Sequence, residues 1–299
     1  HSICKRQQSL LIFYSGLDLV QLVIKNNFMF IIKHKKIFVI ISAVLVGLSL
    51  VSIGYFGLKL GIDFKGGSLT QVQYTDARPD QSVIEGQLLP LELGEMLIQP
   101  TGTDSYSIKT RAINETERAE VLKVLGSSAK EKSFTSIGPS VGAELVRKSI
   151  ISFVFVAFGI IFFLAYSFRK VSKPVSSWKY GLIAIGSLIH DILISVGIFA
   201  LLSNFYGAEV DTLFVVAVLT ILGLSVSDTI VVFDRIRENI RVGHFKNFEE
   251  TVGKSLDQVY TRSIATSFTV IVVLISLAVF GPESTRVFAI MLTAGMFFG

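Results

Sequence analysis

Residues 224 to 239 read Leu-Ser-Val-Ser-Asp-Thr-Ile-Val-Val-Phe-Asp-Arg-Ile-Arg-Glu-Asn, an apolar segment that carries Asp228 in its interior and then ends in charge. Traced back to Leu213, the apolar part is long enough to cross a bilayer as a helix. An ionised carboxylate is costly in hydrocarbon, and acids at membrane depth usually belong to ion or substrate pathways. Asp228 is therefore the first candidate for a functional residue.

The whole chain has the composition of a membrane protein. Of its 299 residues 51% are hydrophobic and 24 are Phe, more apolar surface than a soluble domain of this length can bury. The fold class we predict is a polytopic α-helical membrane protein with six transmembrane helices. A sixth span begins near Val287, and we expect it to be incomplete at Gly299. The five complete spans are predicted at 37–57, 149–166, 181–202, 213–233 and 264–280.

The connections between these spans differ in charge, which predicts the orientation of the chain. Residues 203–211 contain no Lys or Arg, whereas basic residues gather in the alternate connections. Because Lys and Arg stay on the cytoplasmic side, we expect a cytoplasmic N-terminus and an external segment at 59–146. The net charge of +5 is then an orientation signal, and we expect no nucleic-acid partner. The basic residues concerned are Lys33, Lys35, Lys36, Arg169, Lys170, Lys173, Lys179, Arg235, Arg237, Arg241, Lys246, Lys254 and Arg262.

The predicted domains are a cytoplasmic N-terminal segment at 1–34, a first transmembrane helix at 35–58, an α+β domain at 59–146 and a five-helix bundle at 147–299. Within the α+β domain, strands are predicted at 68–74, 95–99, 105–110 and 132–137, and helices at 80–88 and 115–125. Asn114 and Glu117 have the spacing of a capping box. The element order predicts a ferredoxin-like fold, which by itself does not indicate a function.

A counter-ion for Asp228 is predicted in the fifth span. Arg262 stands at its inner start, and the hydroxyls of Ser225 and Ser227 can hydrogen-bond the Asp228 carboxyl. An opposite charge favours the ionised carboxylate, whereas loss of hydration favours the protonated one. A rearrangement that separates Asp228 from Arg262 could therefore convert proton binding into motion. Two alternatives stay open: a static ion pair that fixes helix packing, and an Asp228 that reaches the membrane surface.

A second titratable pair, His190 and Asp191, lies near the middle of the third span. Its position favours a proton relay. The alternative is a polar clasp, in which one of the two side chains bonds a neighbouring backbone group or hydroxyl. Thr266, Ser267 and Thr269 in the fifth span are candidates for that hydroxyl.

Two glycine-rich segments bracket the α+β domain, Gly61-Ile-Asp-Phe-Lys-Gly-Gly67 and Ser136-Ile-Gly-Pro-Ser-Val-Gly142. Glycines at such positions predict tight turns or close backbone approach. The charged end of the fourth span, 234–239, is typical of a solvated anchor at the headgroup boundary. The sequence has no phosphate-binding loop, His-Glu-x-x-His motif or paired cysteines, so we expect no ATP hydrolysis, no metal site and no enzymatic activity.

Together these motifs resemble the SecD/SecF family of protein-export subunits, in its SecF branch, within the resistance-nodulation-division superfamily. The resemblance implies six spans in the bacterial inner membrane and one small periplasmic domain after the first. It implies SecD, the SecYEG channel with its associated subunits, the translocating polypeptide and membrane lipid as partners. It also implies export driven by the proton motive force, with protons as the coupling ion and no other cofactor. The matching positions are Gly61, Asp63, Phe64, Gly66, Gly67, Gly138, Pro139, Gly142, His190, Asp191, Ser227, Asp228, Asp234, Arg235, Arg237, Glu238, Asn239, Arg262, Thr266 and Ser267.

Carried over residue by residue, the membrane aspartate of the family falls on Asp228 and its arginine on Arg262. The resemblance implies that these two form the proton relay, with support from His190, Asp191 and the nearby hydroxyls. One departure is Ser227, because the family usually has Asn at that position.

Three other functions are alternatives to this one. An exporter of small molecules or lipids from the same superfamily would need a partner half, since such exporters usually hold two six-span halves in one chain. An intramembrane aspartyl protease would use Asp191 and Asp228 as a dyad, and it would lose cleavage in Asp191→Asn. A passive scaffold would keep export unchanged when Asp228 is neutralised.

Overall fold

The computed structural model describes residues 32, 34–168, 177–243 and 247–298. The predictions for the 1–34 segment apart from residues 32 and 34, and for Lys33, Arg169, Lys170, Lys173 and Lys246, lie outside the described residues. The chain forms two compact units. The first is helical and holds the described residues up to Gly57, with Ala157–Leu202 and those from Ala217 onward; the second holds Leu58–Val156 and Ser203–Val216.

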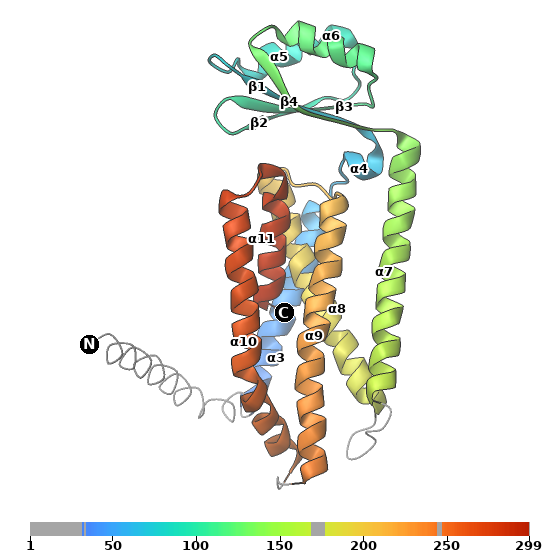
Figure 1. Cartoon of the computed structure of the whole chain (residues 1–299), viewed down its shortest axis with the longest axis vertical. Coiled ribbons are helices and arrows are strands. Elements are labelled where there is room, and N and C mark those ends of the chain that lie inside the picture. Colours follow the sequence, from blue (N-terminus) through green and yellow to red (C-terminus); the bar gives the residue numbers. More distant parts are fainter. Residues whose placement is uncertain (1–31, 33, 169–176, 244–246, 299) are drawn as a thin grey trace, which may run out of the picture. The chain divides into compact units, whose positions relative to one another are not determined.

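Five helices are long and apolar enough to cross a membrane: α3 (Lys35–Phe56), α7 (Pro139–Phe168), α8 (Ser177–Tyr206), α9 (Thr212–Val242) and α10 (Phe248–Phe280) (Figure 1). A shorter apolar helix, α11 (Glu283–Phe298), follows them. Large apolar side chains on these helices are exposed, including Val51 and Phe155 at 68% and 78%. Exposed apolar side chains are expected at lipid-facing positions, because lipid tails are themselves apolar and such side chains do not contact water there.

Four of the five predicted spans lie inside one helix, the first ends one residue past α3, and several helices extend beyond the apolar stretch. The α10 helix begins at Phe248, well before the predicted residue 264, and α9 continues past Phe233 to Val242. Hydropathy detects only the part of a helix that fits hydrocarbon, so it misses polar turns outside it. The early start of α10 is fixed by Asn247, whose side chain accepts a hydrogen bond from the Glu250 N–H.

Small residues bring helices of the first unit close together. The Ser52 hydroxyl on α3 donates to the Gly197 carbonyl on α8 at 2.9 Å, and a Cβ at Gly197 would collide with Ser49. Likewise, a Cβ at Gly295 on α11 would meet the side chain of Ile221 on α9. Contacts of this kind are common between membrane helices, since packing replaces the hydrophobic effect there.

The second unit is built on a four-stranded sheet in the order β2-β3-β1-β4, with every neighbouring pair antiparallel. Its strands are β1 (Gly67–Tyr74), β2 (Leu97–Thr101), β3 (Ser105–Thr110) and β4 (Ala129–Ile137). Two helices, α5 (Gln81–Leu88) and α6 (Glu115–Leu125), cover one face of the sheet (Figure 1). The short helices α4 (Ile62–Lys65) and η1 (Leu89–Leu91) complete the unit. Its core contains Val72, Ile84, Leu88, Ile108 and Val121.

The predicted order of strand, helix, strand, strand, helix, strand is confirmed. The capping box is present: Asn114 accepts from the Glu117 N–H, and Glu117 accepts from the Asn114 N–H, each at 2.9 Å. The two edge strands differ from prediction, since β2 begins at Leu97 and β4 at Ala129. The charged residues Lys130 and Glu131 at the start of β4 break the alternating pattern that predicts a strand. Charged residues are common on edge strands.

Candidate functional site

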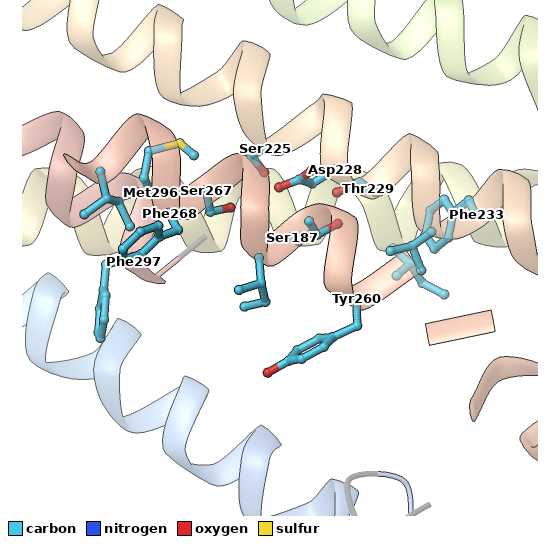
Figure 2. A pocket seen from close by; sticks show the side chains of 15 residues that line it. Ser187, Ser225, Asp228, Thr229, Phe233, Tyr260, Ser267, Phe268, Met296 and Phe297 are labelled. Carbon is cyan, nitrogen blue, oxygen red and sulfur yellow. The ribbon is translucent and has the colours of Figure 1, made fainter. Parts of the chain in front are cut away.

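The helical unit holds a cavity of about 620 Å³ that is lined by residues of α8, α9, α10 and α11. Asp228 lines this cavity and is the only carboxylate among the described residues around it. Most of the remaining lining is aliphatic or aromatic. Figure 2 shows Ser225, Asp228 and Thr229 along one helix, with Ser187 and Ser267 nearby. The cavity therefore surrounds one acid with hydroxyls inside an apolar wall. The hydroxyl-bearing residues are Ser187, Ser225, Thr229, Tyr260, Ser263 and Ser267.

Asp228 is half-buried on α9 and has no hydrogen-bond partner among the residues that the structure describes. Arg262 is exposed on α10, and its positive charge acts on the Asp228 carboxylate. No ion pair within 4.0 Å joins these two described side chains. The predicted partners Asp228 and Arg262 thus interact electrostatically but do not form an ion pair in this structure.

Asp191 lies deeper, with 3% of its surface exposed. Its carboxylate accepts a short hydrogen bond from the Ser225 hydroxyl and lies 2.9 Å from Nδ1 of His190. The Ser195 hydroxyl donates to the Asp191 carbonyl at 2.7 Å. These contacts form the polar clasp that was one alternative for this pair, and they join α8 to α9.

The hydroxyl in the clasp was predicted wrongly. It comes from Ser225 on α9, whereas the fifth span was expected to supply it. Thr266 is exposed and its hydroxyl bonds the Arg262 carbonyl of its own helix at 2.9 Å, while the Thr269 hydroxyl bonds the Thr266 carbonyl at 2.8 Å. Only Ser267 of the three lines the cavity. Local back-bonding of this kind is common for hydroxyls in helices and cannot be seen in residue spacing.

Ser227 is exposed and does not line the cavity, so its predicted bond to Asp228 is not formed in this structure. Consecutive helical residues point about 100° apart, which turns Ser227 away while Ser225, one turn before Asp228, shares its face. Sequence reasoning did not single out Ser187, Thr229, Tyr260 or Ser263, because isolated hydroxyls in apolar helices are more often packing residues.

The charged end of α9 was expected to be a solvated anchor, and for Asn239 that is wrong. Asn239 is buried, and its Nδ2 donates to Ser255 Oγ and to Gln258 Oε1 of α10, both at 2.8 Å. Nε of Arg235 donates to the same Gln258 oxygen at 2.6 Å. This part of the motif therefore fastens α9 to α10. The other charged residues pair along the helix, Arg235 with Glu238 and Arg237 with Asp234, at 2.5 and 3.7 Å.

The two glycine-rich segments pack against each other, as the close-approach prediction required. A Cβ on Gly142 would lie 2.9 Å from the Phe64 carbonyl oxygen, and one on Gly66 would lie 3.0 Å from the Cα of Pro139. Gly66 also has φ of +78°, a conformation that favours glycine. Gly67, with φ of +143°, has no room for a side chain either, because its Cβ would lie 2.8 Å from the Thr110 carbonyl oxygen. Gly138 differs: a Cβ there would meet nothing within 4 Å.

Residues 203–216 are part of the second unit through contacts that the sequence did not reveal. The Gly61 N–H donates to the Val210 carbonyl at 2.8 Å, and the Asp63 carboxylate accepts from the Thr212 N–H at 2.9 Å. Lys109 and Glu209 form an ion pair of 2.7 Å with side chains only 18% and 17% exposed. Asp63, one of the predicted motif residues, thus accepts a hydrogen bond from the first N–H of α9.

A second acid, Asp211, lies at the same helix start and accepts a hydrogen bond from the Phe214 N–H at 2.7 Å. Burial raises the pKa of the Asp211 carboxyl, the Phe214 N–H opposes this, and the negative charges of Asp63 and Glu209 raise it further. No cluster of three potential His, Cys, Asp or Glu metal ligands occurs within the described ranges.

The apolar helices, the small antiparallel sheet and the acid-lined cavity define a multi-pass membrane protein with one compact α+β unit. The chain belongs to the SecD/SecF family of protein-export membrane proteins. The family described as "Protein export membrane protein SecD/SecF, C-terminal" matches residues 117–299, and the "SecD/SecF GG Motif" matches residues 51–77. The latter range contains Gly66 and Gly67.

Named relatives and solved structures agree with this family. The protein translocase subunit SecF of Thermobaculum terrenum is 37% identical over 90% of this chain and 88% of its own length. SecF of Anaerolinea thermophila is 32% identical over the same shares. The crystal structure of SecDF from Thermus thermophilus, titled a translocon-associated membrane protein, matches 91% of this chain with a TM-score of 0.75 and 26% identity. This chain spans 36% of the length of that SecDF chain.

Proposed function

We propose that this chain acts as the SecF subunit of the Sec export machinery, using the proton motive force together with SecD to promote translocation of secreted polypeptides. The observation that carries the proposal is Asp228, an acid without a fixed partner in a hydroxyl-lined cavity of a membrane helix unit. Acids in such surroundings are typical of proton pathways. The names of the relatives, which are translocase subunits, favour protein export over small-molecule or lipid export and over proteolysis.

The proposed mechanism uses two states of Asp228. When protonated, Asp228 is neutral and compatible with the apolar cavity wall. When it loses its proton, the carboxylate attracts Arg262, which already lies within reach of its charge. Forming and breaking this pair would move α10 relative to α9, so proton flow is coupled to motion. Protons are the coupling ion, and the proposal includes no other cofactor, no metal and no enzymatic activity.

The proposed setting is the bacterial inner membrane. We place the N-terminus in the cytoplasm and count α11 as the sixth span, with 59–146 as the periplasmic domain and 147–299 as the bundle. The strand order and the two helices on one face of the sheet support a ferredoxin-like fold for that domain. The larger SecDF chain supports SecD as the partner. SecYEG with its associated subunits, the translocating chain and lipid complete the proposed set.

The test is secretion of a reporter protein by cells that depend on this protein carrying Asp228→Asn. We expect proton-dependent secretion to fall at least tenfold while membrane level and SecD co-purification stay normal. Arg262→Met should have a similar effect, because it removes the charge to which Asp228 responds. The matched control is Asp257→Asn, a half-buried acid in the polar first turns of α10. Unchanged secretion in Asp228→Asn, with a normal complex, would refute the proposal.

A further inference from the structure

Ser225 lies near two acids of the helical unit, Asp191 and Asp228. Its hydroxyl donates to Oδ2 of Asp191 across the contact between α8 and α9. On its own helix it precedes Asp228 by one turn, and both side chains line the same cavity (Figure 2). Helical residues three apart have neighbouring Cβ atoms. A serine hydroxyl carries one proton and two acceptor lone pairs, so it can donate to one carboxyl while it accepts from another.

The two acids have opposite surroundings. Asp191 is almost fully buried and has two polar neighbours, Ser225 and His190. Asp228 lines the cavity and has no hydrogen-bond partner within the described part of the chain. Among the described residues, the other titratable group that lines the cavity is Tyr260, and the charged group that acts on Asp228 is Arg262; both are on α10. The α11 residues that line the cavity, Met296 and Phe297, are apolar.

We propose that Ser225 connects Asp228 to Asp191 and that Asp191 is a second proton-holding group of the pathway. In this step the O–H bond of protonated Asp228 breaks and its proton passes to Ser225 Oγ. The original hydroxyl proton of Ser225 passes to Oδ2 of Asp191. Asp228 becomes a carboxylate, Asp191 becomes neutral and Ser225 is again a neutral hydroxyl, so one proton moves and no electrons are transferred.

The transfer explains why Arg262 and Asp228 are near but unpaired. While Asp191 holds the negative charge, that charge is buried in the clasp with Ser225 and His190. After the transfer the charge sits on Asp228, within reach of Arg262. Pairing of Asp228 with Arg262 would thus follow proton transfer. This inference rests on the proposed function, because protons must first reach Asp228.

The experiment compares the wild type, Asp228→Asn and three further variants, each with SecD in membrane vesicles, by measuring proton-gradient-dependent translocation of a secreted protein at several pH values. We expect Ser225→Ala and Asp191→Asn to reduce it at least tenfold and to flatten its pH profile. Ser225→Thr keeps the hydroxyl and should stay within twofold of wild type. The control is Ser276→Ala, an exposed serine on α10. Co-purification of SecD shows that each variant is assembled.

The outcomes separate this inference from the proposed function. If Asp228→Asn loses translocation but Ser225→Ala keeps it, the link through Ser225 is wrong while the proposed function stands. If Ser225→Ala lowers translocation by the same factor at every pH, or Ser225→Thr is as impaired as Ser225→Ala, Ser225 only packs and the link is again wrong. If Asp228→Asn itself keeps translocation, the proposed function fails first.

Discussion

Several glycines in this chain cannot be replaced by larger residues, because backbone of another segment lies too close to them. The glycine-rich segments could be recognised from sequence as places of close approach, because only glycine tolerates such contacts. Which glycine faces which segment could not be predicted, since that depends on tertiary packing. The same limit applies to Ser225: its spacing to Asp228 is visible in the sequence, whereas its bond to Asp191 on another helix is not.

Gly142→Ala should destabilise the second unit. The new Cβ would stand 2.9 Å from the Phe64 carbonyl oxygen and 3.1 Å from the Gly66 nitrogen, both backbone atoms that cannot rotate away. Overpacking of this kind costs about 1–3 kcal/mol. We expect a clear fall in the unfolding temperature of the purified protein in detergent. Gly138→Ala, in the same segment but in open space, is the matched control and should leave that temperature unchanged.

Asp211→Asn should stabilise the protein at neutral pH. Burial raises the pKa of Asp211 in the folded state, so folding favours its protonated form, and stability is lost as the pH rises through that raised pKa. An amide keeps an oxygen for the Phe214 N–H but carries no charge. We expect a higher unfolding temperature than wild type at pH 7.5 and no gain at pH 4. The exposed Asp76→Asn provides the comparison, and an equal gain at both pH values would contradict the argument.

At the scale of elements, sequence patterns predicted the helices whose position depends on interactions between residues close in sequence. The helix after Asn114 begins where its capping box predicts, and each apolar stretch lies within one helix to within a residue of the helix's bounds. The ends of elements were harder to predict. The charged first residues of β4 break the alternating strand pattern, and hydropathy does not detect the polar first turns of α10. The attachment of residues 203–216 to the second unit could not be predicted, since its partners lie about 100 residues or more away in sequence.

That attachment predicts a charge-swap result. Lys109→Glu or Glu209→Lys alone places two like charges at a poorly hydrated contact, and each should lower the unfolding temperature. The double variant restores opposite charges and should recover most of the loss, which a double-mutant cycle measures. Additive losses in the double variant would show that the ion pair contributes nothing. Lys132→Glu, on β4, which β1 separates from the β3 strand of Lys109, serves as the charge control.

At the scale of the whole molecule, apolar length and charge asymmetry indicated a multi-pass protein, and the five long apolar helices agree with that class. Orientation stays a prediction that rests on the basic residues. In a Cys4→Ser background, a membrane-impermeant thiol reagent should label Ser127→Cys in intact spheroplasts. Lys254→Cys, before the apolar part of α10, should react only after the membrane is opened. The reverse pattern would overturn the assigned topology.

The attachment of residues 203–216 also matters to anyone who wishes to study the α+β unit in solution. A fragment cut out at 59–146 would leave Lys109 without its acid and would lose the backbone partners of Gly61 and Asp63. Such a fragment would expose surface that is covered in the intact chain, and this surface would favour self-association and non-specific binding. Joining residues 203–212 to it through a flexible linker would give a more faithful reagent for spectroscopy and pull-down experiments.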